Sequence, residues 1–156
     1  MKYFAVMNRN LIYCLFLLIF FLGGITSAQE NNFLNKFNSN KKVVKVQVIF
    51  NQIEDAISKG NVSALSNYLS SQTYLSLSNG IRGYYSSNQT FYILEDFFKI
   101  YSVTSFRFDN LNSAENTPYA TGVYNYEYRG KRNSAQVYIS LNKIGRNWKI
   151  TQITIN

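Results

Sequence analysis

The sequence predicts an α+β fold in which three N-terminal helices pack on a curved antiparallel sheet. Two observations lead to this prediction. As far as Ile100, most apolar residues recur at the spacing of amphipathic helices, and from Phe106 onward they alternate with polar residues at a period of two. Helices grouped early and hairpin-connected strands grouped late are typical of α+β domains rather than of parallel sheets.

Residues 1–28 have the pattern of a secretory signal peptide. Basic residues precede an apolar run at 11–22, and small residues follow it. Those 12 residues are shorter than the roughly 20 that cross a bilayer. We therefore expect cleavage between Ala28 and Gln29 and no stable membrane anchor afterwards. The expected location is the periplasm or the extracellular space.

The composition of the remaining chain limits its chemistry. Removing 28 of the 156 residues leaves 128, enough for one domain with its own core. This part has 14 basic and 8 acidic residues, a net charge of +6, but no His and no Cys. A basic chain can bind nucleic acid, yet export argues against such a partner. No metal site, cofactor or nucleic-acid partner is predicted.

Residues 29–42 are rich in Asn and Lys and lack periodicity, which predicts a polar linker or a loosely docked arm. The domain then covers 43–156. Its first helix is predicted over 43–59, with Gly60 as its stop. Asn61 can cap a second, shorter helix. The apolar face of that second helix is Val62, Leu65, Tyr68 and Leu69.

The next elements are a hairpin and a third helix. Alternation predicts a strand over 73–78, and Asn79-Gly80 predicts a turn into a short return strand over 81–85. Ser86, followed three residues later by Gln89, forms a capping-box pattern. The amphipathic spacing that follows predicts a third helix ending near residue 100.

Four more strands follow. They are predicted around Phe106–Phe108 and over Ala120–Arg129, Ala135–Asn142 and Trp148–Ile155. The apolar alternation of the last strand changes phase after Ile150, which predicts a bulge near Thr151-Gln152. A bulge there would help to curve the sheet.

This order of elements resembles the nuclear transport factor 2-like superfamily, whose helices close the concave face of a curved sheet to form a cone. The resemblance covers about 43–156 and includes the segment 53–61 and the late meander. More narrowly, 80–86 and 148–155 resemble a secreted, uncharacterised bacterial family. That narrower family has no assigned activity, so the resemblance implies a fold and not a function.

No catalytic residue is predicted. In isomerases of this superfamily the base stands just beyond the second helix, whereas here residues 70–74 contain no carboxylate. Glu54-Asp55 and Glu95-Asp96 lie on the polar flanks of their helices and are expected to face solvent. Without His, Ser and Thr have no evident activating base. We therefore expect a protein that is not an enzyme.

The candidate binding feature is aromatic. Tyr124, Tyr126 and Tyr128 share one strand face. A two-residue loop at Gly130-Lys131 would pair Tyr124 with Val137 and turn the tyrosines inward, as we favour; a loop over 129–131 would pair Tyr124 with Gln136 and turn them outward beside Tyr138. The predicted pocket residues are Tyr68, Phe97, Tyr124, Tyr126 and Trp148.

Three functions remain open from the sequence. The first is a non-catalytic, exported domain that binds a small apolar or aromatic ligand, or a protein partner of the cell envelope. The second is an isomerase- or hydrolase-like enzyme that pairs a buried carboxylate, for example Asp109, with a Tyr. The third is an assembly protein that forms homodimers through its sheet. Ordinary core packing is the competing explanation for each tyrosine.

Overall fold

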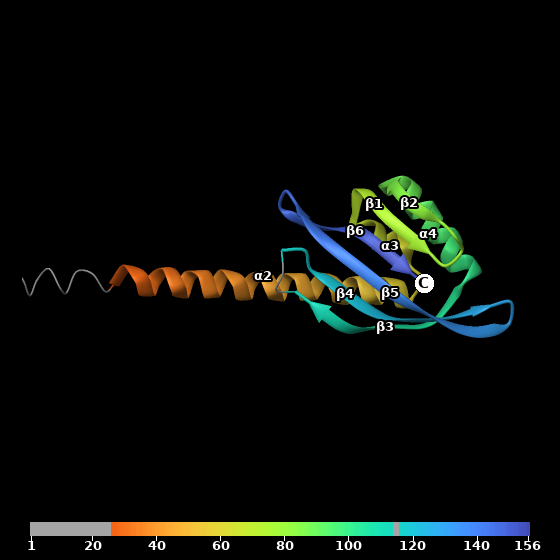
Figure 1. Cartoon of the computed structure of the whole chain (residues 1–156), viewed down its shortest axis with the longest axis horizontal. Coiled ribbons are helices and arrows are strands. Elements are labelled where there is room, and N and C mark those ends of the chain that lie inside the picture. Colours follow the sequence, from red (N-terminus) through yellow and green to blue (C-terminus); the bar gives the residue numbers. More distant parts are fainter. Residues whose placement is uncertain (1–25, 114–115) are drawn as a thin grey trace, which may run out of the picture. The chain divides into compact units, whose positions relative to one another are not determined.

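The computed structural model describes residues 26–113 and 116–156, which form two compact units. The first unit ends at Lys41 and the second is Lys42–Asn156. Figure 1 shows the elements in chain order. They are α2 (Thr26–Ser58), α3 (Val62–Ser66), β1 (Leu69–Leu77), β2 (Arg82–Ser86), α4 (Ser87–Ile100), β3 (Ser102–Asn112), β4 (Tyr119–Tyr128), β5 (Lys131–Ile144) and β6 (Asn147–Ile155).

Helix α2 is longer than predicted. Residues 29–42, predicted to be a polar linker or a loosely docked arm, are helical. Residues 34–41 are all exposed, which explains why no apolar stripe marks them as a helix. The stripe begins at Val46, where the helix becomes buried. Within the residues described, no helix is long and apolar enough to cross a membrane.

The predicted signal peptide falls almost entirely outside the described residues, which begin at Thr26. Ala28 and Gln29, the predicted cleavage pair, lie in the first turn of the described part of α2. Cleavage between them stays a prediction.

The end of α2 and the start of α3 follow the sequence prediction. Gly60 adopts a positive φ of 59°. Its N–H donates to the Ile57 carbonyl (2.9 Å), and the Asn61 N–H donates to the Ala56 carbonyl (2.8 Å), which together form a Schellman cap. The Asn61 side chain then accepts from the Ala64 N–H at 3.0 Å. Glycine and asparagine thus turn the chain sharply between two helices.

Helix α3 is shorter than predicted, because Tyr68 and Leu69 leave the helix. Leu69 begins β1, and the Tyr68 carbonyl accepts from the Ile150 N–H of β6 at 2.7 Å. Pairing with a strand about 80 residues away therefore outweighs the local helical spacing.

Helix α4 starts at the predicted capping box. The Ser86 hydroxyl accepts from the Gln89 N–H at 3.3 Å, and the Gln89 side chain accepts from the Ser86 N–H at 3.0 Å. This helix lies between β2 and β3 in the chain, so the prediction that all three helices are N-terminal is wrong for α4.

The six strands form one sheet in the order β2-β1-β6-β5-β4-β3. All neighbours are antiparallel except β1 and β6, which are parallel, so the prediction of a fully antiparallel sheet is wrong for this pair. Strand β6 joins the β1–β2 hairpin to the β3–β5 meander. Ser140 pairs with Gln152 while Leu141 pairs with Ile150, leaving Thr151 as the extra residue of the predicted bulge.

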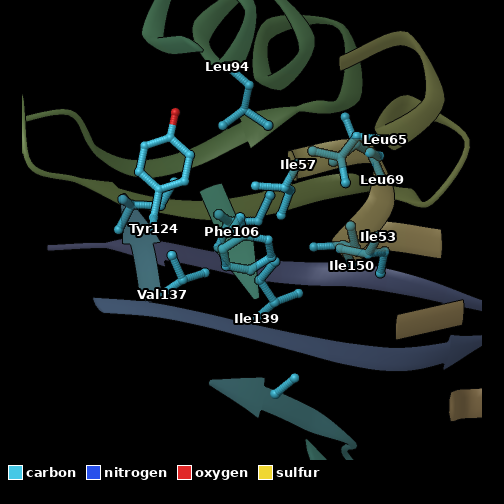
Figure 2. Packing of buried hydrophobic residues seen from close by; sticks show 14 of the residues in the cluster. Ile53, Ile57, Leu65, Leu69, Leu94, Phe106, Tyr124, Val137, Ile139 and Ile150 are labelled. Atoms are coloured by element: carbon cyan, nitrogen blue, oxygen red, sulfur yellow. The ribbon is translucent and has the colours of Figure 1, made fainter. Parts of the chain in front are cut away.

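One hydrophobic core lies between the helices and the inner face of the sheet (Figure 2). Helices α2 and α4 contribute Ile53, Ile57 and Leu94, which are fully buried. The strands contribute their alternate residues, as the period of two predicts. These strand residues include Leu75, Phe106, Tyr124, Val137, Ile139, Leu141, Ile150 and Ile153.

Candidate functional site

The tyrosine ladder of β4 faces inward, as favoured from the sequence. The hairpin loop is residues 129–130, both at positive φ (52° and 73°), as in a type I′ turn. Tyr128 pairs with Lys131, and Tyr124 consequently pairs with Ala135. The favoured loop at Gly130-Lys131 is therefore displaced by one position, and the alternative loop over 129–131 is one residue too long. The favoured inward orientation survives because the register differs by two residues, which preserves the face.

Tyr124 is the most deeply packed member of the ladder, with no exposed surface. Its hydroxyl donates to the Tyr101 carbonyl at the end of α4, at 2.6 Å. Its ring centroid lies 5.9 Å from that of Phe98 and 5.6 Å from that of Tyr126. Burial, with a smaller contribution from Tyr126, raises the pKa of the Tyr124 phenol far above its ordinary value. Tyr124 is thus a neutral donor that ties α4 to the sheet.

The five predicted pocket residues do not form one site. Phe97, Tyr124 and Tyr126 come together, with a Phe97–Tyr124 centroid distance of 6.3 Å. Trp148 lies elsewhere, because its β5 partner is position 143 whereas that of Tyr124 is position 135. Eight residues of strand span about 27 Å. Tyr68 lies next to β6 near Trp148, because its carbonyl accepts from the Ile150 N–H.

Three of the five predicted pocket residues are covered by core packing. Phe97, Tyr124 and Trp148 belong to the buried core, and the Lys42 ammonium lies 5.7 Å from the Trp148 ring centroid. Tyr68 borders a hollow of about 430 Å³ between α2 and α3. Its hydroxyl donates to the Gln52 side chain at 2.7 Å. A ligand-binding role for the five residues stays a prediction.

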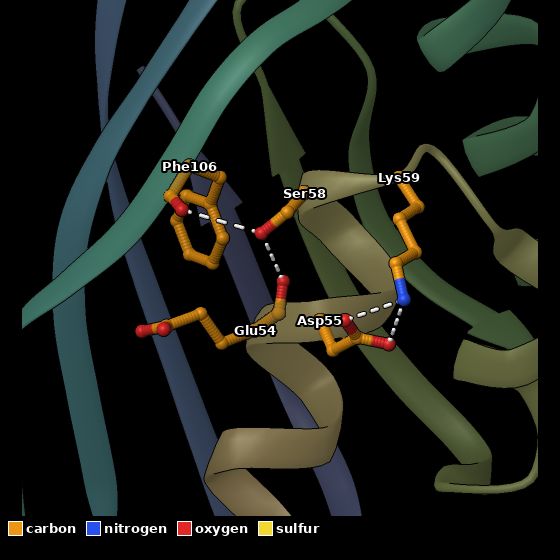
Figure 3. A network of polar contacts seen from close by, with 5 residues as sticks. All are labelled: Glu54, Asp55, Ser58, Lys59 and Phe106. Carbon is orange, nitrogen blue, oxygen red and sulfur yellow. Dashed lines mark hydrogen bonds and ion pairs between the residues drawn. The ribbon is translucent and has the colours of Figure 1, made fainter.

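Glu54 serves the fold rather than facing solvent, contrary to the sequence prediction. It is half-buried, and its carboxylate accepts from the Phe108 N–H of the edge strand β3 at 2.7 Å. One turn later, the Ser58 hydroxyl bonds the Phe106 carbonyl at 3.2 Å and the Glu54 carbonyl at 2.6 Å (Figure 3). Two α2 residues thus satisfy two polar groups on the free edge of β3.

The other described carboxylates offer no buried acid or base. Asp55 pairs with Lys59 at 2.7 Å, as Figure 3 shows, and both side chains are exposed. Glu95 pairs with Lys99 at 3.0 Å. Asp109 is exposed and accepts from the Thr121 hydroxyl, so it is not the buried carboxylate that the alternative enzyme hypothesis requires. Over the same described ranges, no group of three or more His, Cys, Asp or Glu could hold a metal ion.

The outer face of the sheet presents a row of polar and aromatic side chains that crosses five strands. Register places these residues side by side in the order Tyr84, Tyr74, Gln152, Ser140 and Tyr119. At about 4.8 Å between neighbouring strands, the row is about 19 Å long. Tyrosines stand at its two ends, and amide and hydroxyl groups stand between them.

Both ends of the row are aromatic pairs. The rings of Tyr74 and Tyr84 meet edge-on with centroids 5.1 Å apart. The rings of Tyr119 and Tyr138 stack with centroids 5.5 Å apart. Tyr84 is 72% exposed, so this face carries aromatic surface that the fold does not cover.

Between the pairs the outer face is hollowed, with a volume of about 430 Å³. We call this feature the outer hollow. Its lining contains only uncharged residues. They are Gln72, Tyr74, Tyr84, Thr117, Tyr138, Ser140, Asn142, Thr151 and Gln152. The volume falls within the range of small-molecule sites.

Residues 50–156 match the family described as a domain of unknown function, DUF4783. The chain belongs to the DUF4783 family. No curated protein matches it. Among solved structures, this DUF4783 domain is similar to a DUF4783 family protein from Bacteroides uniformis, with 19% identity and a TM-score of 0.62, over 68% of this chain and 94% of that one.

Two further similar structures place the fold more broadly. One is Rd1NTF2_04 with long sheet, with 11% identity and a TM-score of 0.57, over 70% of this chain and 98% of that one. The other is a protein with a ketosteroid isomerase-like fold from Catenulispora acidiphila, in complex with trimethylamine. It has 14% identity and a TM-score of 0.56, over 69% of this chain and 83% of that one. The DUF4783 domain therefore has the predicted nuclear transport factor 2-like fold.

Sequence reasoning missed most of the outer hollow of the DUF4783 domain. It placed Tyr138 on the outer face of the sheet, but it did not single out Tyr84 or Tyr119. Alternation could have identified these tyrosines. Each lies next to an inward-facing residue of its strand, so it must point to the outer face. The missing information was the β1–β6 pairing, which brings Tyr74 beside Gln152.

Proposed function

We propose that this DUF4783 domain is an exported, non-catalytic binding domain and that its binding surface is the outer hollow. The observation that carries the proposal is the aromatic-ended, uncharged row across five strands. As the sequence predicts, the domain would bind a ligand or an envelope partner. The binding site, however, would be the outer face of the sheet and not the inside of the cone.

The packing of the cone supports this choice of surface. Inside the cone, Phe97, Phe98 and Tyr124 fill the space between α4 and the sheet, with centroid separations of 5.9 to 6.3 Å. A ligand among these rings would have to displace core side chains, at a cost of several kcal/mol for a large aromatic group. The outer hollow needs no such displacement.

The positions of the carboxylates support a non-catalytic role. General acid–base catalysis needs a group that is positioned and has a pKa near the working pH. The half-buried Glu54 carboxylate already accepts a hydrogen bond from the backbone of β3. Asp55 and Asp109 are exposed. The outer hollow has neither a carboxylate nor a basic side chain in its lining.

Export is supported by the basic start, the apolar run and the small residues before Gln29. Mass spectrometry of the protein recovered from its native cell envelope or medium tests this part. The expected N-terminal residue is Gln29. A recovered chain that still carries residues 1–28 would contradict export by cleavage.

The binding surface is tested by a thermal-shift screen of sugars, lipids, aromatic compounds and peptides. Each hit is then measured on two variants, Tyr138→Ala in the outer hollow and Tyr126→Ala in the cone, each against its own melting temperature. We expect the shift to persist in Tyr126→Ala and to disappear in Tyr138→Ala. Shifts lost only in Tyr126→Ala, or no hit in any class, would refute the proposed surface.

A further inference from the structure

We propose that the ligand of the outer hollow is a neutral carbohydrate chain that lies along the row from Tyr84 to Tyr119. This inference rests on the proposed function and adds the chemical class of the ligand. It follows from the charge of the lining, its unused hydrogen-bonding groups and the placement of its aromatic rings.

Charge excludes one class of ligand. None of the nine residues that line the hollow is Asp, Glu, Lys or Arg. A phosphate, a carboxylate or a nucleic acid would lose hydration there without gaining an opposite charge, which is costly. Arg129 and Lys131 lie at the β4–β5 hairpin loop. Two basic residues lie beside the hollow without lining it: Lys149 pairs with Asn142 and donates to the Asn67 carbonyl at 2.8 Å, and Arg82 shares the face of Tyr84 on β2. The ligand is therefore uncharged where it contacts the hollow.

Hydrogen-bonding groups exclude a purely apolar ligand. Gln72 and Asn142 are exposed, and their side chains have no hydrogen-bond partner among the described residues. Each amide offers one acceptor oxygen and two donor hydrogens. A hydrocarbon would remove water from these groups without replacing its hydrogen bonds, at about 1–3 kcal/mol per group. The ligand must therefore carry groups that both donate and accept hydrogen bonds, as the hydroxyl groups of a sugar do.

The floor of the hollow has a fixed polar surface. The Ser140 and Thr151 hydroxyls lie 3.4 Å apart, and the Gln152 amide donates to the Thr154 hydroxyl at 3.3 Å. The bulge at Thr151 places two consecutive polar residues of β6 on this floor. Side chains that are already ordered lose less conformational entropy when a ligand binds.

The aromatic rings of the outer hollow fit the apolar face of a sugar ring. A pyranose ring has an apolar face of C–H groups as well as a rim of hydroxyls, so it can stack on tyrosine while its rim pairs with amides. Tyr84 and Tyr138 stand on opposite sides of the hollow, on β2 and β5. A chain of several sugar units would use both platforms, since β2 and β5 are three strand spacings apart, about 14 Å.

Affinity electrophoresis of the purified protein tests the inference, with gels that contain laminarin, dextran, mannan or xyloglucan as neutral probes and alginate as an anionic probe. We expect at least one neutral polysaccharide to retard the protein and alginate to leave it unretarded. Tyr84→Ala and Tyr138→Ala should each raise the dissociation constant about tenfold, as for the loss of an aromatic platform. The Gln72→Ala variant should weaken binding without removing a ring.

Tyr92→Ala is the matched control, because Tyr92 is a 57% exposed tyrosine on α4, outside the outer hollow. It should bind as the wild type does. Failure of all four neutral probes, equal retardation by alginate, or an equal loss in Tyr92→Ala would overturn the carbohydrate assignment. If another ligand class from the thermal-shift screen still depends on Tyr138, the proposed surface stands and only the ligand class is wrong. Self-association lost in Tyr84→Ala, measured by light scattering, would assign the hollow to a second copy instead.

Discussion

The hydrogen bond between Tyr124 and the end of α4 gives the sharpest prediction about stability. The Tyr124→Phe variant keeps the aromatic ring and removes only the hydroxyl, which donates to the Tyr101 carbonyl at 2.6 Å. Because Tyr124 has no exposed surface, water cannot easily replace this donor. A net hydrogen bond contributes about 1 kcal/mol, and an unsatisfied buried acceptor adds to its loss. We expect a decrease of about 1–2 kcal/mol in the free energy of unfolding near pH 7.

The same variant should change how stability depends on pH. Burial raises the pKa of Tyr124 in the folded protein above the unfolded value of about 10. Below pH 10 both states keep the proton, so the full contribution is present. Above that pH the unfolded chain releases the proton first, and stability falls by up to about 1.4 kcal/mol per pH unit from this group. The Tyr124→Phe variant lacks this contribution to the slope.

Urea denaturation followed by tryptophan fluorescence, from pH 8 to pH 11, measures both effects. The difference in stability between wild type and Tyr124→Phe should be constant up to about pH 10 and shrink above it. Tyr84→Phe, at a 72% exposed position, is the control and should follow the wild type. Equal stability of Tyr124→Phe and wild type at pH 7, or a difference that stays constant up to pH 11, would refute this account of Tyr124.

Three further substitutions test other contacts. Glu54→Gln should lower the free energy of unfolding in urea by about 1–2 kcal/mol, because a neutral amide accepts the hydrogen bond from β3 less strongly than a carboxylate. The control Asp55→Asn, at an exposed position, should lower it by less than about 0.5 kcal/mol. Gly122→Ala should prevent stable folding, seen as loss of the thermal transition, since its Cβ would clash with the Arg107 backbone; a normal transition would contradict the close approach of β3 to β4 at this glycine. Ser86→Ala should cost about 1 kcal/mol of thermal stability by removing the α4 cap, and an unchanged melting temperature would argue against the cap.

Local chemistry made several elements predictable. Gly60 and Asn61 end one helix and begin the next, and the Ser86–Gln89 box begins α4, because in each case a few neighbouring residues supply the cap. The period of two also showed that Tyr124, Tyr126 and Tyr128 share one face, whereas their inward direction depended on the hairpin register. These features depend on contacts within a few residues or within one strand.

Other features depend on contacts that local patterns do not contain. The parallel pairing of β1 with β6 ends α3 early and assembles the outer hollow, yet its partners are about 80 residues apart. The β4–β5 loop uses Arg129 at positive φ, where glycine is the usual choice, so the sequence favoured the wrong loop position. Glu54 was assigned to solvent because only the folded sheet brings the Phe108 N–H within reach.

The central position of β6 has a consequence for the order of folding. Because β6 alone connects the β1–β2 hairpin with the three-stranded meander, these two parts share no direct strand pairing. A growing polypeptide cannot complete the hydrogen-bonded sheet until Ile155 has left the ribosome. Until then both halves keep open edges, which favours a chain that is unfolded, or held by a chaperone, throughout its synthesis.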